Sequence, residues 1–180
     1  MKIKVMKTAS WAVLPAYATD GSGCFDLSGA VKDFEPSGRL EADAEDPRTL
    51  MANGVVFDTG LKFEIPKGYA MLLYSRSGHG FKHDIRLVNS VGVIDSDYRG
   101  NVMVKLRADS LEGKLQLGTM VEGALGHAIS QYDPNAVVEA PTLHRIAQAM
   151  IVPIPEVTFE EASELSDTER GEGGFGSTGV

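Results

Sequence analysis

The chain has 180 residues, a formal net charge of −8, an apolar content of 43% and a charged content of 23%. This length and composition suit one soluble domain with a packed core and leave little material for two. Proteins that bind long nucleic acids usually carry a basic stripe that neutralises phosphates, so this acidic chain is expected to bind no nucleic acid. A small anion remains a candidate ligand, because a few arginines and a metal ion are enough to hold it.

The first residues of the chain indicate in which cellular compartment the protein is expected. They have early lysines, a short apolar patch and the ending Ala16-Tyr17-Ala18, as in a signal peptide, but Pro15 interrupts the patch. Ile3 and Val5 alternate with lysines, which favours a first strand over residues 2–7. The single cysteine, Cys24, excludes an intramolecular disulfide, and no apolar run is long enough to cross a membrane. We therefore expect a cytoplasmic protein that binds no membrane.

Short runs of β type dominate the rest of the chain. They cover residues 2–7, 55–65, 69–74, 87–94, 101–106 and 146–154. Turn residues separate them, as at Asn53-Gly54, Pro66-Lys67-Gly68 and Tyr98-Arg99-Gly100. Nothing long has a helical period, although the segment after Ser77 is predicted to form a turn or two of helix. The pattern predicts an all-β barrel or sandwich.

Three segments are less regular. Residues 33–53 are acidic and rich in turn formers, which predicts a surface loop. Residues 107–144 mix glycine, alanine and polar residues with scattered apolar ones, and we expect an ordered surface elaboration rather than a solvated loop. Residues 166–180 are rich in glycine and end the chain.

The glycine-rich end contains groups that bind nucleotides. Arg170-Gly171-Glu172-Gly173-Gly174-Phe175-Gly176-Ser177-Thr178-Gly179 has no lysine before its hydroxyl residues and no helix after them, so it is not a P-loop. The alternative interpretation is a flexible C-terminal tail without a binding role. An arginine, an aromatic ring and two hydroxyls among glycines can instead contact phosphates and stack on a base.

Three further patterns carry candidate site residues. Ser75-Arg76-Ser77-Gly78-His79-Gly80 follows an apolar strand and is either an anion site or a simple helix N-cap. Residues 89–101 are predicted to form a β-hairpin in which Asp95 is a candidate general base; two solvated turn aspartates are the alternative. Arg145-Ile146-Ala147-Gln148 begins a strand, where its polar side chains face either a ligand or solvent.

In order along the chain, these patterns resemble the five motifs of the trimeric, magnesium-dependent dUTPases. The first motif is represented by Leu14-Pro15-Ala16-Tyr17-Ala18-Thr19-Asp20-Gly21-Ser22 with Asp26-Leu27, the second by Arg76-Ser77-Gly78, the third by Gly92-Val93-Ile94-Asp95 with Tyr98-Arg99-Gly100, the fourth by Arg145-Ile146-Ala147-Gln148 and the fifth by the glycine-rich end. Together they span residues 14–179, and the fifth matches almost letter for letter.

The resemblance implies a jelly-roll type β-sandwich that forms a homotrimer with C-terminal arm exchange and with active sites shared between subunits. Residues 1–165 would be the β-domain, with an insertion at about 107–144, and residues 166–180 a flexible arm that closes the active site. Some phage members of the family carry extra segments in the same connection that bind regulators. The insertion is therefore a candidate surface for a regulatory protein partner.

The implied reaction is hydrolysis of dUTP to dUMP and pyrophosphate, which keeps uracil out of DNA and supplies dUMP for dTMP synthesis. Asp95 is expected to activate the water that attacks the α-phosphorus, Tyr98 to exclude a 2′-hydroxyl, and Asp26 to approach Mg²⁺ through water. The other expected substrate contacts form three groups. The phosphates would be bound by Arg76, Ser77, Gly78, Gln148, Arg145 and Arg170. Uracil would be bound by backbone groups between Asn89 and Met103, including Gly92, Val93 and Ile94, and the closing arm would add Phe175, Gly176, Ser177 and Thr178.

Some positions depart from the family pattern. Cys24 stands where glycine is usual, so a positive φ there would strain it, and we expect it to be a small packed side chain. His79 replaces a small apolar residue and has the spacing of helical metal ligands with His83, but without an evident third ligand, exposed or hydrogen-bonded histidines are favoured over zinc. The related dCTP deaminases have a catalytic glutamate at the place of Lys105, and a lysine cannot shuttle that proton.

The sequence predicts a selectivity that one nucleotide panel can measure. With Mg²⁺, the chain should release pyrophosphate from dUTP far faster than from UTP, dCTP or dTTP, because Tyr98 leaves no room for a 2′-hydroxyl and the backbone of residues 89–103 fits uracil. Pyrophosphate and ammonia are quantified for each nucleotide. Equal turnover of UTP and dUTP would contradict the role of Tyr98, and ammonia released from dCTP would favour a deaminase.

Overall fold

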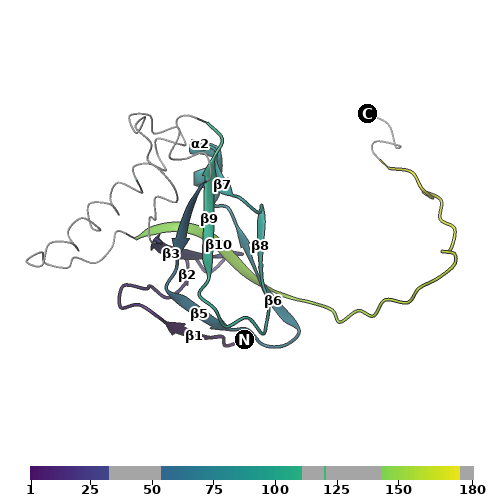
Figure 1. The fold of residues 1–180 in the computed structure, drawn as a ribbon, viewed down its shortest axis with the longest axis horizontal. Coiled ribbons are helices and arrows are strands. Elements are labelled where there is room, and N and C mark those ends of the chain that lie inside the picture. Colours follow the sequence, from purple (N-terminus) through teal and green to yellow (C-terminus); the bar gives the residue numbers. More distant parts are fainter. Residues whose placement is uncertain (33–53, 111–119, 121–142, 175–180) are drawn as a thin grey trace, which may run out of the picture.

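The computed structural model describes residues 1–32, 54–110, 120 and 143–174, and its elements are almost all antiparallel strands (Figure 1). The strands are β1 (Lys4–Lys7), β2 (Ala16–Tyr17), β3 (Phe25–Val31), β4 (Val55–Asp58), β5 (Leu61–Glu64), β6 (Tyr69–Tyr74), β7 (Ile85–Leu87), β8 (Val91–Ile94), β9 (Met103–Ala108) and β10 (His144–Pro153). The described helix, α2 (Ser77–His83), follows β6. The all-β prediction is confirmed.

Most strands join one eight-stranded sheet in the order β7-β9-β4-β3-β10-β6-β8, with β2 added at β3. Strands β1 and β5 form a separate pair. Strand β3 links the two halves of the large sheet, because its first part, Phe25–Gly29, pairs with β10 and its last two residues pair with β4.

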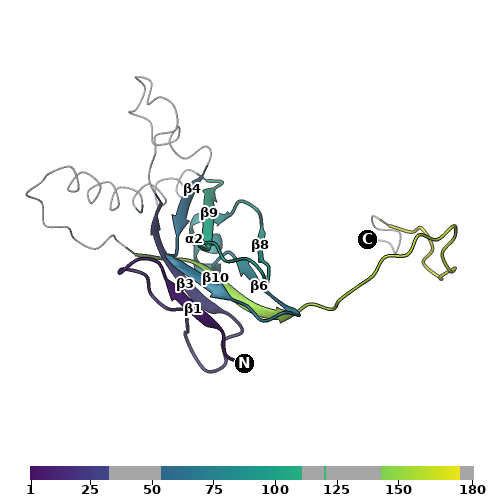
Figure 2. The same ribbon diagram turned by 60° about the horizontal axis from the view of Figure 1, so that its bottom comes forward.

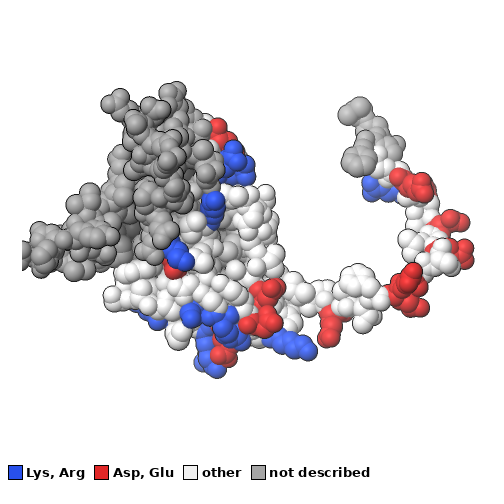
Figure 3. Space-filling model, viewed as in Figure 1, with Lys and Arg blue, Asp and Glu red and all other residues white. Residues whose placement is uncertain are grey.

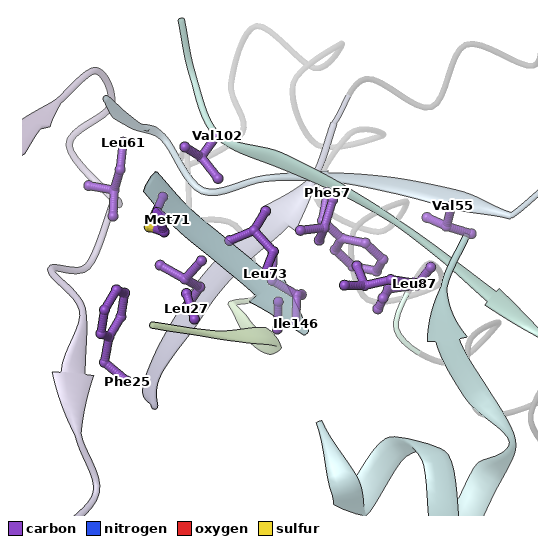
Figure 4. Close-up of a cluster of buried hydrophobic side chains, with 14 of the residues drawn as sticks. Phe25, Leu27, Val55, Phe57, Leu61, Met71, Leu73, Leu87, Val102 and Ile146 are labelled. Carbon is purple, nitrogen blue, oxygen red and sulfur yellow. The ribbon is translucent and has the colours of Figure 1, made fainter. Parts of the chain in front are cut away.

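The core lies between these halves (Figure 4). Leu27 on β3, Phe57 on β4, Met71 on β6 and Ile146 on β10 are each 0% exposed. Along β9 buried and exposed residues alternate strictly, as the period of two requires for a strand with one face on the core. Complete burial of a leucine or phenylalanine side chain stabilises the fold by about 1.5–3 kcal/mol relative to exposure.

A tight corner divides the run predicted as one strand over 55–65. Gly60 has φ +63°, a conformation that glycine adopts readily, and the Asp58 Oδ1 atom accepts the Gly60 N–H at 2.7 Å. The buried Thr59 hydroxyl donates to the Val102 carbonyl at 2.8 Å and accepts the Leu61 N–H at 3.1 Å. The chain therefore leaves the large sheet after β4 and pairs with β1 as β5.

The predicted hairpin over residues 89–101 is also wrong. Strand β8 pairs with β6, whereas β9 pairs with β4 and β7. The segment between β8 and β9 is bound instead to the corner around Thr59. The Val102 N–H donates to the Leu61 carbonyl, and the Val102 carbonyl accepts the Thr59 N–H. The run predicted over 87–94 is likewise two strands, and Ser90 between them has φ +60°.

Strands β2 and β3 are absent from the sequence-based prediction. Strand β3 contains Asp26, Ser28 and Gly29, which are poor strand formers. Gly29 is required by close approach of β4, because a Cβ atom there would lie 2.5 Å from the Asp58 carbonyl oxygen and 2.7 Å from the Ile146 side chain.

The bounds of the predicted insertion also change. Arg107 and Ala108 belong to β9, and His144 begins β10, so the connection runs from 109 to 143. Most of it and all of 33–53 lie outside the described residues. Met120 is 4% exposed and joins the apolar core, which supports packing of the connection on the barrel at this residue.

After β10 the chain extends away from the barrel (Figures 1 and 2). We call residues 154–174 the arm. All of its residues are exposed except Gly173, and Val157, Phe159 and Leu165 are 64%, 96% and 88% exposed. Acidic side chains line the arm (Figure 3). In the described part of the chain, no helix is long and apolar enough to span a membrane.

Substitution of Leu27 tests the position of the core. Leu27→Ala should lower the free energy of unfolding by about 2–5 kcal/mol, because it leaves a cavity between the two halves of the sheet. The matched change Leu165→Ala, on the exposed arm, should alter it by less than about 0.5 kcal/mol. Denaturant unfolding measures both, and equal losses would contradict the assignment of the core.

Candidate active site

The best-defined group of candidate residues lies where β3, β10 and β6 run side by side. Gln148 of β10 is paired with Asp26 of β3 on one side and with Tyr74 of β6 on the other. Directly opposed residues of neighbouring strands share a face of the sheet, so these three partly buried side chains form a row.

A bulge in β10 adds Arg145 to this row. In a regular strand, residues three apart point to opposite faces. Here the register shifts between Arg145 and Ala147, so that Arg145 opposes Ser28 and Gln148 opposes Asp26. Ile146 and Ala147 are both 0% exposed, and the extra residue lets both polar side chains face Asp26.

Asp26 binds two arginines. Its Oδ1 atom lies 3.2 Å from Nε of Arg76, and its Oδ2 atom lies 3.4 Å from a terminal guanidinium nitrogen of Arg145. The Asp26 and Arg76 side chains are 24% and 22% exposed, and Arg145 is 61% exposed. One carboxylate between two guanidiniums leaves a net positive charge and unused N–H donors, which suit a phosphate.

The segment after β6 brings further donors to the same place. Arg76 has an extended backbone, and its carbonyl accepts the N–H groups of His79 and Gly80. No side chain caps α2, which disfavours the simple N-cap interpretation. Ser77 and Gly78 are exposed at the start of the helix, where backbone N–H groups have no partner within the helix.

Ser75 is a structural residue that the sequence analysis did not single out. Its hydroxyl oxygen accepts the N–H of the buried Leu87 at 2.9 Å and so fixes the start of α2 against β7. Nothing in the sequence distinguishes its hydroxyl from that of Ser77, because the distinction depends on a contact twelve residues away.

Histidines lie beside the arginines. Nδ1 of His79, Nδ1 of His83 and Nε2 of His144 are buried and have no hydrogen-bond partner within the described part of the chain. The expectation that His79 and His83 are exposed or hydrogen-bonded is therefore wrong for their Nδ1 atoms. Among residues 1–32, 54–110, 120 and 143–174, no group of three or more potential ligands is placed to hold a metal ion.

The electrostatics of these histidines follow from their surroundings. Burial lowers the pKa of His79, and electrostatic repulsion from Arg76, His83, His144 and Arg145 lowers it further. Burial lowers the pKa of His144 as well, against the opposing effect of a hydrogen bond to the Met120 backbone. A lowered pKa keeps these imidazoles neutral at neutral pH, and their contribution to stability is lost as the pH falls below the ordinary histidine value.

Asp95 and Tyr98 lie in the connection after β8. Asp95 is exposed, and its carbonyl accepts the Tyr98 N–H at 3.2 Å. The Tyr98 hydroxyl donates to the Asn101 carbonyl at 3.0 Å, and the Asn101 amide reaches the Asp58 carboxylate at 3.1 and 3.2 Å. The Tyr98 ring lies so close to Gly100 that no Cβ atom would fit there. These contacts hold Tyr98, which is 41% exposed.

The other residues predicted to read uracil lie on or beside β8. Asn89 is exposed, Gly92 is buried against Leu73, and Val93 and Met103 are 58% and 39% exposed. Ile94 is partly buried against the core. Strand β8 is the last in the sheet order, so its outer edge offers backbone N–H and C=O groups.

The structure does not bring Asp95 to the arginines of the same chain. Val91 opposes Tyr74 at one end of the β6–β8 ladder, and Ile94 opposes Met71 at the other. Arg76 follows Tyr74, and Asp95 follows Ile94, so the two residues lie beyond opposite ends, roughly 15–20 Å apart at about 3.3 Å per strand residue. A general base within reach of the attacking water and an arginine on the phosphates cannot act together over that distance.

Among the residues expected to close the site, Arg170 lies on the arm. Arg170 is exposed, and its Nε atom donates to the Gly173 carbonyl at 2.8 Å. Phe175, Gly176, Ser177 and Thr178 lie outside the described residues. Cys24 is partly buried with no positive φ, so the strain considered for it does not arise, and burial raises the pKa of its thiol.

Comparison with known proteins adds to this geometry. The dUTPase family model matches residues 44–112. A deoxyuridine 5′-triphosphate nucleotidohydrolase of Nautilia profundicola is 37% identical over 181 residues, covering 99% of this chain and 99% of that protein. The dUTPase of Staphylococcus bacteriophage 80alpha with dUPNHPP has a TM-score of 0.65 at 22% identity, covering 99% of each chain. A mutant dUTPase from phage phi11 of S. aureus, whose structure reveals the coordination of a structural Mg(II) ion, has a TM-score of 0.56 at 17% identity, covering 91% of this chain and 98% of that one.

The β fold is that of a jelly roll, with an arginine-lined row of polar side chains on β3 and β10, and the solved structures share this fold. An identity of 37% over nearly the whole of both sequences shows the family as well as the fold. The chain belongs to the dUTPase family.

Two neighbouring serines give matched substitutions at the site. Ser75→Ala should lower the free energy of unfolding by about 1–3 kcal/mol, because the buried Leu87 N–H loses its acceptor. Ser77→Ala, at an exposed position, should change it by less than about 0.5 kcal/mol and weaken nucleotide binding instead. Urea unfolding and nucleotide titration separate the two effects, and a stability loss at Ser77 equal to that at Ser75 would contradict them.

Proposed function

We propose that this chain hydrolyses dUTP to dUMP and pyrophosphate in a site completed by neighbouring copies of the chain. Family membership supports the reaction. The observation that carries the shared site is the separation of Asp95 from Arg76 at opposite ends of the β6–β8 ladder. A site that needs both residues requires Asp95 of another copy.

On the phosphate side, Arg76 and Arg145 bind phosphate oxygens through guanidinium N–H groups not used by Asp26. Ser77 and Gly78 add donors from the start of α2, and Gln148 holds a phosphate or its water. Their common face on β3, β10 and α2 supports these roles. Such fixed donors stabilise charge that develops on the phosphates without reorganising during the reaction.

On the chemical side, Asp95 accepts a proton from the water that attacks the α-phosphorus, and pyrophosphate leaves. The exposed position of Asp95 suits a base that meets a substrate held by another copy. Tyr98 covers the deoxyribose where a 2′-hydroxyl would project, and its hydrogen bond to Asn101 fixes the ring for this purpose. Backbone groups at Asn89, Gly92, Val93, Ile94 and Met103 read uracil.

Mg²⁺ fits this site as an ion held mainly by the substrate. The described residues offer one suitable carboxylate, Asp26, and no cluster of ligands for a bare ion. Mg²⁺ keeps several waters and binds phosphates readily, so a single half-buried carboxylate that contacts its water is sufficient. The bound ion would neutralise phosphate charge, while Asp26 orients its water and both arginines.

The arm supplies the remaining groups in this proposal. We keep residues 1–165 as the proposed β-domain unit, although its strands end at Pro153 and residues 154–165 already belong to the arm. Residues 166–180, the end of the arm and the six residues after it, close over the nucleotide of a neighbouring copy in the homotrimer. Arg170 then lies on the phosphates and Phe175 on uracil, beside Gly176, Ser177 and Thr178. Exposure of the arm and of Ile154, Val157 and Phe159 at its start supports docking on another copy. The regulatory partner of the connection, the cytoplasmic location and the absence of nucleic acid partners stay predictions.

Mixing two inactive variants tests the shared site. Asp95→Asn should lower kcat by about 10²–10⁴-fold through loss of the base, and Arg76→Ala should abolish activity through loss of phosphate binding. When the two variants are unfolded, mixed in equal amounts and refolded, one site in four joins a native Arg76 to a native Asp95. Activity should return to about a quarter of the wild-type value, because the two residues meet across a heterologous contact.

Each variant refolded alone is the control and should stay inactive. If the mixture also stays inactive while mixed trimers are present, Asp95 and Arg76 act within one chain and the shared site is wrong. If neither wild-type nor mixed protein releases pyrophosphate from dUTP, the proposed activity itself is wrong.

A further inference from the structure

Imidazole nitrogens without partners lie next to the arginines assigned to the phosphates. His79 is three residues after Arg76, His83 is one turn further along α2, and His144 immediately precedes Arg145. Each of the three rings has a buried nitrogen without a hydrogen-bond partner among the described residues. The group therefore has proton-accepting capacity that the proposed reaction does not use.

We propose that binding of a nucleoside triphosphate at this site is coupled to uptake of a proton by His79, which is neutral in the empty site and an imidazolium in the complex. The inference rests on the proposed assignment of Arg76 and Arg145 to the phosphates. It adds a proton-linked step to nucleotide binding.

The empty site keeps His79 neutral because burial, which has the largest effect, and the positive charge of Arg76 both oppose its protonation. Repulsion from His83, His144 and Arg145 acts in the same direction. The carboxylate of this group, Asp26, is already bound to the two arginines.

The other charged groups around α2 do not change this balance. Lys82 and Asp84, which are exposed, lie within and just after the helix. Strand β7, which packs against α2, carries Arg86, and Arg86 is bound to Asp109 at 2.6 Å.

A bound triphosphate reverses the sign of the local field. It brings several negative charges to the two arginines, and a nearby opposite charge favours the ionised form of a titrating group. The proton comes from solvent and ends on a ring nitrogen of His79; no covalent bond to the nucleotide forms or breaks. By linkage, the same proton strengthens nucleotide binding as the pH falls.

Among the three rings, His79 is best placed to respond. It lies in the first turn of α2, next to Ser77 and Gly78, and Arg76 and Arg145 are both among the charges that act on it. The ring of His144 instead hydrogen-bonds to the Met120 backbone and packs edge-on against Phe57.

Calorimetry measures this coupling directly. A non-hydrolysable probe, α,β-imido-dUTP with Mg²⁺, is titrated into the full-length protein at pH 7 in several buffers that differ in ionisation enthalpy. The slope of the observed enthalpy against the buffer enthalpy gives the protons taken up. At this pH wild type should take up roughly half a proton more than His79→Gln, because the bound phosphates favour the imidazolium form of His79.

Matched variants separate titration from structure. His79→Gln keeps a polar side chain without a titration near neutrality, and His79→Leu restores an apolar residue if the first variant fails to fold. Lys82→Gln removes an exposed charge from the same helix and should leave the proton count at the wild-type value. Between pH 6.5 and 8.5, the affinity of wild type relative to His79→Gln should fall roughly three- to fourfold, which is the change that uptake of half a proton at pH 7 implies.

Equal proton uptake by wild type and both His79 variants, with the probe bound by all of them, would overturn the proposal. An equal loss of proton uptake in Lys82→Gln would also overturn it, because the effect would then belong to the general field of the helix. Failure of the wild type to bind the probe would instead contradict the proposed function.

Discussion

A one-residue bulge in β10 determines which side chains meet at the candidate site. Strand β10 is paired on both sides, with β3 and with β6, so its register is fixed along most of its length. Without the bulge, the period of two would place Arg145 and Gln148 on opposite faces, and one of them would enter the core. The bulge buries Ile146 and Ala147 consecutively and leaves both polar residues on the Asp26 side. The spacing of the Arg-Ile-Ala-Gln pattern is thus a consequence of backbone geometry as much as of chemistry.

Charge in this chain is divided between two parts. The arm, residues 154–174, has seven acidic residues and one basic residue, so it carries −6 of the formal −8 (Figure 3). The rest of the chain is therefore close to neutral, and the cations around Asp26 are not opposed by a strongly acidic barrel. Net charge alone describes solubility and long-range steering. It gives a poor account of a site in which one carboxylate orients two guanidiniums.

The sequence predicted some features well because they depend on local pattern. Residues 69–74 form β6 as predicted, and the short helix after Ser77 is present. Strand β3 escaped prediction because Gly29 is selected by the approach of β4 rather than by strand propensity. For the site, motif order identified Asp26, Arg76, Arg145 and Gln148, which the structure brings together. It could not reveal that Asp95 lies at the other end of the sheet, since distance between motifs depends on strand register.

In the proposed shared site, closure over the nucleotide falls to the arm and the residues that follow it. Asp95 and Arg76 sit at the ends of paired strands and cannot move toward each other without breaking the β6–β8 ladder. The arm is exposed and glycine-rich at its end, so ordering it over a nucleotide costs conformational entropy. Its acidic residues also repel a triphosphate, and Arg170 is its one basic group. Under the proposed function, closure is therefore favourable only where cations of the barrel, and a metal ion carried by the substrate, have already balanced the phosphates. This order of events would make an empty site stay open and a filled site exclude water.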